Sequence, residues 1–212
     1  NEIGSIQPIK DISDLLEKHP TVSFHVDAVQ AIGKMPLEDF LTERVDFATF
    51  SGHKFHSVRG VGFIFAKEGK KISPLLTGGG QESDKRSTTE NVAGIAATAE
   101  SVRPLLDQFE AGQHRLVAMK KIILEELSTY PDVTIFSQME GFLPNILTFG
   151  IKNVRGEVTV HAFEDHQIYI STTSACSSKA GKPAGTLLAM GIPQKLAQTA
   201  VRISLDQEND MS

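Results

Sequence analysis

The chain has 212 residues, of which 40% are hydrophobic, enough for an ordinary buried core in one large domain or two modest ones. Lys and Arg number 21 against 26 Asp and Glu, and the net charge of -5 argues against a nucleic-acid or anionic-membrane surface. No apolar run reaches the length of a membrane span, and no signal-peptide pattern opens the chain. A single cysteine, Cys176, excludes an internal disulfide, so we expect a cytoplasmic protein.

Both ends of the chain look cut. It begins at Asn1 without a methionine, and it stops shortly after the strand-like segment VRISL. We therefore expect a piece of a longer protein.

The first hundred residues predict an α/β sheet domain. Apolar residues at helical spacing over 9–19 predict a short amphipathic helix, which Pro20 ends. Segments rich in β-branched and aromatic residues predict three strands: TVSFHVDA ending at Asp27, VDFATFSG at 45–52 and VGFIFAKEG at 61–69. The polar, glycine-rich stretch 71–91 predicts a long loop. A helix followed by several short apolar strands is typical of the α/β class.

The second half predicts a smaller α+β domain. From Glu90 to about Tyr130 the pattern is helical, with a break expected at AGQH, 111–114, and a domain boundary near it. The segments that follow predict, in order, strands in VTIFS and NILTFGI, a helix in EVTVHAFEDH, a strand in QIYIST, a helix in TLLAMG, and a helix running into a strand in LAQTAVRISL. The expected domains are residues 1–110 and 111–212.

Lys54 is the first candidate for chemistry. It lies where the apolar segment FATFSG breaks into a polar turn, HKFHS. A partly desolvated lysine amine can form a Schiff base with an aldehyde, and catalytic groups of α/β proteins gather where strands end. An ordinary surface lysine is the alternative.

Asp27 and Gln30 follow another predicted strand, in FHVDAVQ. A carboxylate facing a pyridine nitrogen keeps that nitrogen protonated and makes the ring an electron sink. Gln30 comes close to Asp27 if the strand turns into a helix. A helix cap or a turn is the alternative role for Asp27.

The loop GGGQESDKRSTTEN could bind an anion. Three glycines, 78–80, permit unusual backbone angles, and residues 86–89 (RSTT) offer hydrogen-bond donors that suit a phosphate, just before a helix N-terminus. The pattern is not a P-loop, so it predicts no nucleotide. The alternative is a capped helix start after a loop.

Two residues of the second half are further candidates. Cys176 lies in the small, polar segment ISTTSACSSKAGKPAG, typical of an exposed loop with an accessible thiol, although an incidental cysteine is the alternative. Arg202 lies within an apolar strand and needs a partner, either a substrate carboxylate or an internal acid. The histidine pairs at 53/56 and 161/166 lack ligands at zinc-site spacing, so we predict no metal site.

Taken in order, NEIG, HVDAVQ, SGHK, GGGQE with RSTTEN, SACSS and VRISL form a specific series. The chain resembles the cysteine desulfurases, pyridoxal-phosphate (PLP) enzymes of the class V aminotransferase group with fold type I. The resemblance covers nearly the whole chain but only the middle and later parts of such an enzyme. It implies that residues 1–110 are the remainder of the PLP-binding large domain and that 111–212 are a truncated small domain.

The resemblance implies a role for each matching residue. Lys54 would hold PLP and then act as a general base, and Cys176 would be the sulfur-accepting nucleophile. The other implied contacts are Asp27 to the pyridine nitrogen, Gln30 to the ring hydroxyl oxygen, Ser51 and His53 to the phosphate, Thr89 to the phosphate of a partner subunit, and Asn1 with Arg202 to the substrate carboxylate. The implied protein is a homodimer that converts L-cysteine to L-alanine and passes sulfur to an acceptor protein.

Three departures accompany the resemblance. Thr88 stands where the family usually has glycine, and Gly181 and Lys182 precede Pro183 where it usually has a leucine and an acid. The upstream part, which in the family supplies a ring-stacking histidine, is absent from the chain. Two alternatives therefore stay open: another class V PLP enzyme, such as a selenocysteine lyase or aminotransferase, and an inactive piece that keeps only partner-binding surfaces.

Overall fold

The structure is a computed structural model that describes residues 1–173 and 185–209. The chain divides into two compact units, which we name by a residue of each. The Lys54 unit is Pro8–Phe109, and the Arg202 unit joins Asn1–Gln7 to Glu110–Ser212. The first seven residues thus group with the second half of the chain. That these units correspond to the expected domains 1–110 and 111–212 stays a prediction.

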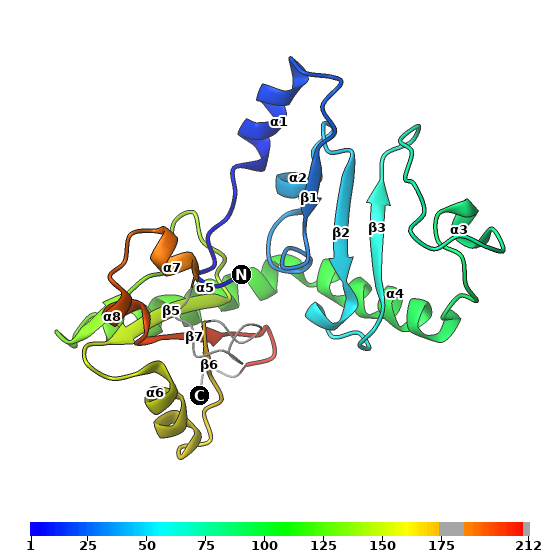
Figure 1. Cartoon of the computed structure of the whole chain (residues 1–212). Coiled ribbons are helices and arrows are strands. Elements are labelled where there is room, and N and C mark those ends of the chain that lie inside the picture. Colours follow the sequence, from blue (N-terminus) through cyan, green and yellow to red (C-terminus); the bar gives the residue numbers. More distant parts are fainter. Residues whose placement is uncertain (174–184, 210–212) are drawn as a thin grey trace. The chain divides into compact units, whose positions relative to one another are not determined.

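The Lys54 unit contains a three-stranded sheet in the order β1-β2-β3. β2 lies parallel to β1 and antiparallel to β3, and Figure 1 shows the three strands side by side. The elements of this unit are α1 (Ile9–Glu17), β1 (His25–Asp27), α2 (Leu37–Phe40), β2 (Phe47–Ser51), the 3-10 turn η1 (Gly52–Lys54), β3 (Gly62–Ala66), α3 (Gln81–Asp84) and α4 (Val92–Asp107). The expected α/β class is confirmed.

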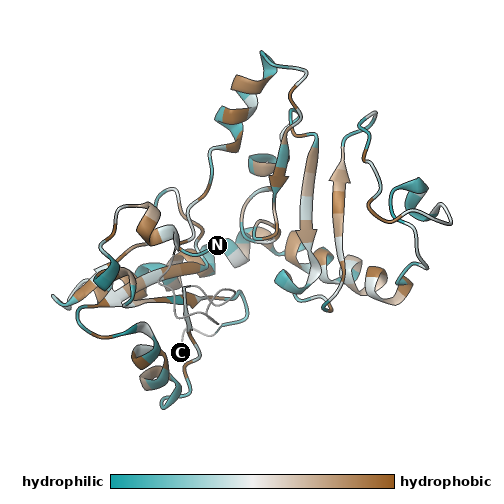
Figure 2. Cartoon of the chain, in the orientation of Figure 1, coloured by the Kyte–Doolittle hydropathy of each residue, from teal (hydrophilic) through white to brown (hydrophobic). Residues whose placement is uncertain are grey.

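The core of the Lys54 unit forms around β2. Ala48 and Phe50 point to its buried face, and Phe40 and Val45 pack in the same cluster. The helix predicted at 9–19 is confirmed as α1, and its Ile9 packs against this core. Figure 2 shows hydrophobic residues along β2 and β3 and both kinds of residue around α1. The three predicted strands are confirmed, but each is shorter than predicted. β1, for example, contains only three residues of TVSFHVDA.

The helical segment after Glu90 is broken at Gln108, so the break predicted at 111–114 is wrong. Gln108 leaves the helical conformation between α4 and α5 (Phe109–Leu127). Gly112 lies buried inside α5, where an added Cβ would come within 2.3 Å of the Gln207 side chain. The glycine therefore permits a close approach rather than ending a helix.

The Arg202 unit contains an antiparallel sheet in the order β4-β5-β7-β6. Its elements after α5 are β4 (Val133–Ile135), β5 (Ile146–Ile151), α6 (Gly156–Glu164), β6 (Ser171–Thr172), α7 (Gly185–Ala189), α8 (Gln194–Ala197) and β7 (Ala200–Ser204). These match the predicted order of helices and strands. The strand expected over QIYIST is confirmed only at its last two residues. Within the described ranges, no helix is long and apolar enough to cross a membrane.

Candidate functional site

Asp27 and Ser51 end the two parallel strands of the Lys54 unit, at the same edge of the sheet. Asp27 lies opposite Thr49 in the β1–β2 register, and Ser51 lies opposite Gly62 at the start of β3. The Asp27 side chain is solvent-accessible, and one carboxylate oxygen accepts a hydrogen bond from the backbone N–H of Val29 at 3.1 Å. The carboxylate thus stabilises the local turn, and its second oxygen can still accept from a ligand.

Lys54 is placed at this edge by a tight turn. The 3-10 turn η1 follows β2 directly, and Phe55, which comes next, is buried in the core. Gly52 is also buried, and a Cβ there would lie 3.0 Å from the Ser57 side chain and 3.1 Å from the Val61 carbonyl oxygen. The backbone on both sides of Lys54 is therefore closely packed, while the half-buried Lys54 side chain itself is not part of the core.

A second lysine, Lys34, connects the turn after β1 to the turn after β2. Its Nζ donates to Gln30 Oε1 at 3.0 Å and to the backbone carbonyl oxygen of Lys54 at 3.1 Å. The sequence reasoning missed Lys34. The signal was present as the i, i+4 spacing of Gln30 and Lys34 in QAIGK, which brings two side chains together over one turn.

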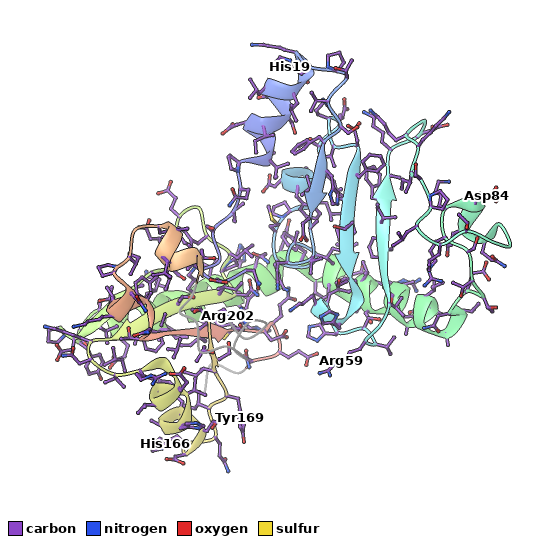
Figure 3. The ribbon with its side chains drawn as sticks, viewed as in Figure 1. His19, Arg59, Asp84, His166, Tyr169 and Arg202 are labelled. Carbon is purple, nitrogen blue, oxygen red and sulfur yellow. The ribbon has the colours of Figure 1, made fainter. Side chains whose placement is uncertain are left out.

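Two histidines and an arginine lie at the same edge. His53 belongs to η1, while His56 and Arg59 lie in the connection to β3, and Figure 3 labels Arg59 beside the turn that leads into β3. All three side chains are exposed. The charges of Arg59, Lys34 and Lys54, together with the hydrogen-bond donors of the imidazoles, make this edge suited to an anionic ligand such as a phosphate.

Thr89 lies in the exposed segment before α4 of the same unit. Thr88, beside it, has a φ of 157°, which is unusual for a β-branched residue and suits the glycine that the family usually has there. The helix start that follows is capped, because the Asn91 side chain accepts from the Gly94 backbone N–H at 3.1 Å.

The opposite edge of the sheet holds a buried ion-pair network around Asp46. Its carboxylate accepts from Arg44 at 3.0 Å, from Lys70 at 2.8 Å and from the Phe24 backbone N–H at 2.8 Å. Burial by itself would raise the pKa of Asp46, but the hydrogen bonds from Lys70, Phe24 and Arg44 lower that pKa to about 2. The charge network therefore fastens the strand ends that lie away from Lys54.

Asn1 and Arg202 come together within the Arg202 unit. Arg202 Nη1 lies 3.4 Å from both the backbone oxygen and the side-chain Oδ1 of Asn1. Arg202 belongs to β7, opposite Ser171 of β6, and is labelled in Figure 3. Two residues from opposite ends of the chain thus present an amide and a guanidinium side by side, a combination able to hold a carboxylate.

Cys176, the expected nucleophile, lies outside the described residues. Within the described ranges, no group of three or more His, Cys, Asp and Glu residues could hold a metal ion.

The structure assembles the expected site residues in two sets. Asp27, Gln30, Ser51, His53 and Lys54 share one sheet edge, and Asn1 contacts Arg202.

The arrangement at the sheet edge suits a specific kind of ligand. An amine on Lys54 can condense with an aldehyde, a carboxylate on Asp27 can pair with a protonated ring nitrogen, and the surrounding cations can neutralise a phosphate. The roles of the individual residues stay predictions.

The chain is similar to known proteins of one family. The model of the aminotransferase class-V family matches residues 1–212. A NifS/IcsS protein homolog of Lactobacillus delbrueckii subsp. bulgaricus is 48% identical over 212 residues, which are 100% of this chain and 55% of the relative. The cysteine desulfurase IscS of Clostridium botulinum is 35% identical, over 99% of this chain and 53% of its own length. The chain spans about half the length of the curated relatives it matches.

Solved structures of related proteins indicate the same family. A NifS-like protein superposes with a TM-score of 0.88 at 34% identity, covering 99% of this chain and 54% of its own. SspA, solved in complex with cysteine, has a TM-score of 0.73 at 26% identity, covering 99% of this chain and 57% of its own. These likenesses confirm the expected fold type I architecture, and the chain belongs to the aminotransferase class-V family, among relatives named as cysteine desulfurases.

Proposed function

We propose that the protein containing this chain is a PLP-dependent cysteine desulfurase, which removes sulfur from L-cysteine, releases L-alanine and holds the sulfur on Cys176 as a persulfide. The observation that carries the proposal is the shared sheet edge, where a lysine amine, a carboxylate and a carboxamide follow the ends of two parallel strands. Curated relatives at 35% identity bear the name cysteine desulfurase. The family is PLP-dependent, as expected from the sequence.

The residues present fit PLP. The donor set contains one amine for the aldehyde on Lys54, one acceptor for the pyridine N–H on Asp27 and one amide for the ring hydroxyl oxygen on Gln30. Ser51 and His53 would hold the phosphate. Gly52, where a Cβ would crowd the Ser57 side chain at 3.0 Å and the Val61 carbonyl oxygen at 3.1 Å, keeps this turn tight.

When bound, PLP supplies an electron sink for a carbanion at the substrate Cα. The Lys54 amine would be the general base that takes the Cα proton. Asp27 keeps the ring nitrogen protonated, because a nearby carboxylate favours the charged form of that nitrogen. Asn1 and Arg202 hold and orient the substrate carboxylate.

Sulfur transfer uses Cys176. Its thiolate attacks the sulfur of L-cysteine, a new sulfur–sulfur bond forms, and the carbon–sulfur bond breaks with its electron pair going to Cβ. Protonation of that carbon completes L-alanine. The persulfide sulfur then passes to an acceptor protein, in the cytoplasm. Thr89 reaches the phosphate bound by a partner subunit, so the protein acts as a homodimer.

The test is borohydride trapping with PLP, followed by peptide mapping, on the chain and on any longer polypeptide that contains it. We expect a reduced pyridoxyl group on Lys54 and on no other lysine, and no labelling of this peptide in a Lys54→Arg control. Label scattered over several lysines, or none, would refute the cofactor assignment. A Cys176→Ala variant should keep the Lys54 label but lose sulfur release from L-cysteine. Retained release would instead indicate another class V PLP reaction.

A further inference from the structure

Lys34 makes a contact that the proposed function does not explain. It lies in the connection between β1 and α2, and its ammonium group donates to a side chain of one candidate turn and to the backbone of the other. These two acceptors, Gln30 Oε1 and the Lys54 carbonyl oxygen, belong to residues expected to contact the same ligand. One half-buried cation therefore holds together two parts of the candidate site.

The contact fixes which way the Gln30 carboxamide faces. A lysine ammonium has three donors and no acceptor, so only the oxygen of the Gln30 amide can bond to it. The amide oxygen and nitrogen leave the same carbon in different directions. With Oε1 bound to Lys34 at 3.0 Å, the NH₂ group is directed elsewhere and acts as a donor. Without the lysine, the amide could turn over and present its oxygen instead.

The orientation matters because the ring hydroxyl of PLP is most useful as an oxyanion. An N–H donor stabilises that oxyanion, whereas a carbonyl oxygen in the same place would repel it. A charged donor on the far side of the amide also polarises it and strengthens its N–H donors. The second bond, to the Lys54 carbonyl oxygen at 3.1 Å, restrains the backbone that carries the reactive amine.

We propose that Lys34 is a positioning residue, which orients the Gln30 amide as a donor toward the ring oxygen of PLP and restrains the backbone at Lys54. The inference rests on the proposed function, since it requires PLP on Lys54. Lys34 touches no reacting atom in this scheme and acts through Gln30 and Lys54.

The test is a double-mutant cycle read by the pKa of the PLP–Lys54 chromophore, from a pH titration of the absorbance of the PLP-loaded protein. Lys34→Met and Gln30→Ala should each raise this pKa by about one pH unit, since each loses one hydrogen bond to a charged group. The double variant should match Gln30→Ala alone, because the effect of Lys34 on this pKa passes through Gln30, whereas its bond to the Lys54 carbonyl oxygen restrains the backbone. Lys34→Arg keeps the donor and should stay within a few tenths of the original value.

Lys71→Met is the matched control, because Lys71 is an exposed lysine of the same unit. A merely structural role of Lys34 would lower the melting temperature and leave the pKa where it is in Lys71→Met, and that result would overturn the inference. Additive effects in the double variant would overturn it as well. If Lys34→Met fails to fold, Gln30→Glu serves instead: it keeps the contact with Lys34 but removes the NH₂ group, so an unchanged pKa there refutes the inference.

The same samples separate this inference from the function on which it rests. Failure of borohydride to label Lys54 in the unsubstituted protein refutes both. Selective labelling of Lys54 with no pKa change in Lys34→Met refutes the role of Lys34 alone.

Discussion

Replacing Asp46 by Asn should destabilise the Lys54 unit by about 2 kcal/mol at neutral pH. The pKa of Asp46 falls from an ordinary 3.8 to about 2 in the folded chain, and each pKa unit corresponds to about 1.36 kcal/mol. The side chain of Asp46 is 3% exposed, so little of this energy is lost to solvent screening, although Lys70 is 33% exposed and its share weakens in salt. Asn also leaves the cations of Arg44 and Lys70 without their counter-charge.

The sign of the pH dependence follows from the lowered pKa. The folded state binds the proton less tightly than the unfolded state, so the stabilisation is complete above the unfolded pKa and is lost as pH falls through about 2. At pH 3 about 1 kcal/mol should remain. The assay is urea unfolding of wild type and Asp46→Asn at pH 7, 5 and 3, and the difference between the two should shrink at the lowest pH.

Asp39→Asn is the control for this series. Asp39 pairs with Lys10 at 2.5 Å, but the two side chains are 37% and 59% exposed. An exposed pair is screened by water and contributes little to stability, so this variant should be nearly as stable as wild type. A difference between Asp46→Asn and wild type that is equal at pH 7 and pH 3, or no larger than that of Asp39→Asn, would refute the reasoning.

Three further predictions concern other parts of the chain. Burial lowers the pKa of Lys120 from 10.5 to about 8. Between these two pH values the unfolded state binds the proton that the folded state has lost, so the free energy of unfolding should rise by up to about 3 kcal/mol between pH 8 and pH 10.5. Lys120→Met should lack that rise in chemical-denaturation curves. Gly62→Ala places a Cβ 2.4 Å from the Phe50 backbone oxygen, which should cost about 1–3 kcal/mol and lower the melting temperature; an unchanged value would show that β3 can shift. Asn91→Ala removes the cap of α4 and should cost about 1 kcal/mol, whereas Asn91→Asp should keep most of the stability.

The sequence predicted the order of elements where one pattern dominated. Helical spacing of apolar residues located α1, and runs of β-branched and aromatic residues located β2 and β3. The break between α4 and α5 was misplaced, because Gly112 resembles a helix breaker until the neighbouring Gln207 side chain is known. The left-handed backbone at Glu82 and Ser83 had no signal either, since neither residue is a glycine.

For the candidate site too, the sequence indicates what depends on neighbouring residues and not what depends on long-range contacts. Lys54 and Asp27 are candidates because each lies where an apolar strand ends, a property of a few neighbouring residues. That they share one sheet edge depends on the parallel pairing of β1 and β2, which local sequence does not determine. The i, i+4 spacing indicates the contact of Lys34 with Gln30, but its bond to the Lys54 carbonyl oxygen joins residues 20 positions apart, which local sequence does not determine.

The ion pairs of Asp46 and the hydrogen bonds of Lys34 lie at opposite ends of β2, so we expect substitutions at the two residues to have different effects. Asp46 precedes β2 and bonds to Phe24 before β1 and to Lys70 after β3, so it fastens three chain segments at one sheet edge. Lys34 contacts the other end, where the Lys54 turn leaves the sheet. Asp46→Asn should therefore lower stability but leave the pKa of the PLP–Lys54 chromophore unchanged, whereas Lys34→Met should shift that pKa at a smaller cost in stability. A pH titration of the chromophore and urea unfolding of both variants would measure the pKa and the free energy of unfolding. A pKa shift in Asp46→Asn as large as that in Lys34→Met would contradict the separation and would mean that β2 transmits strain between its ends.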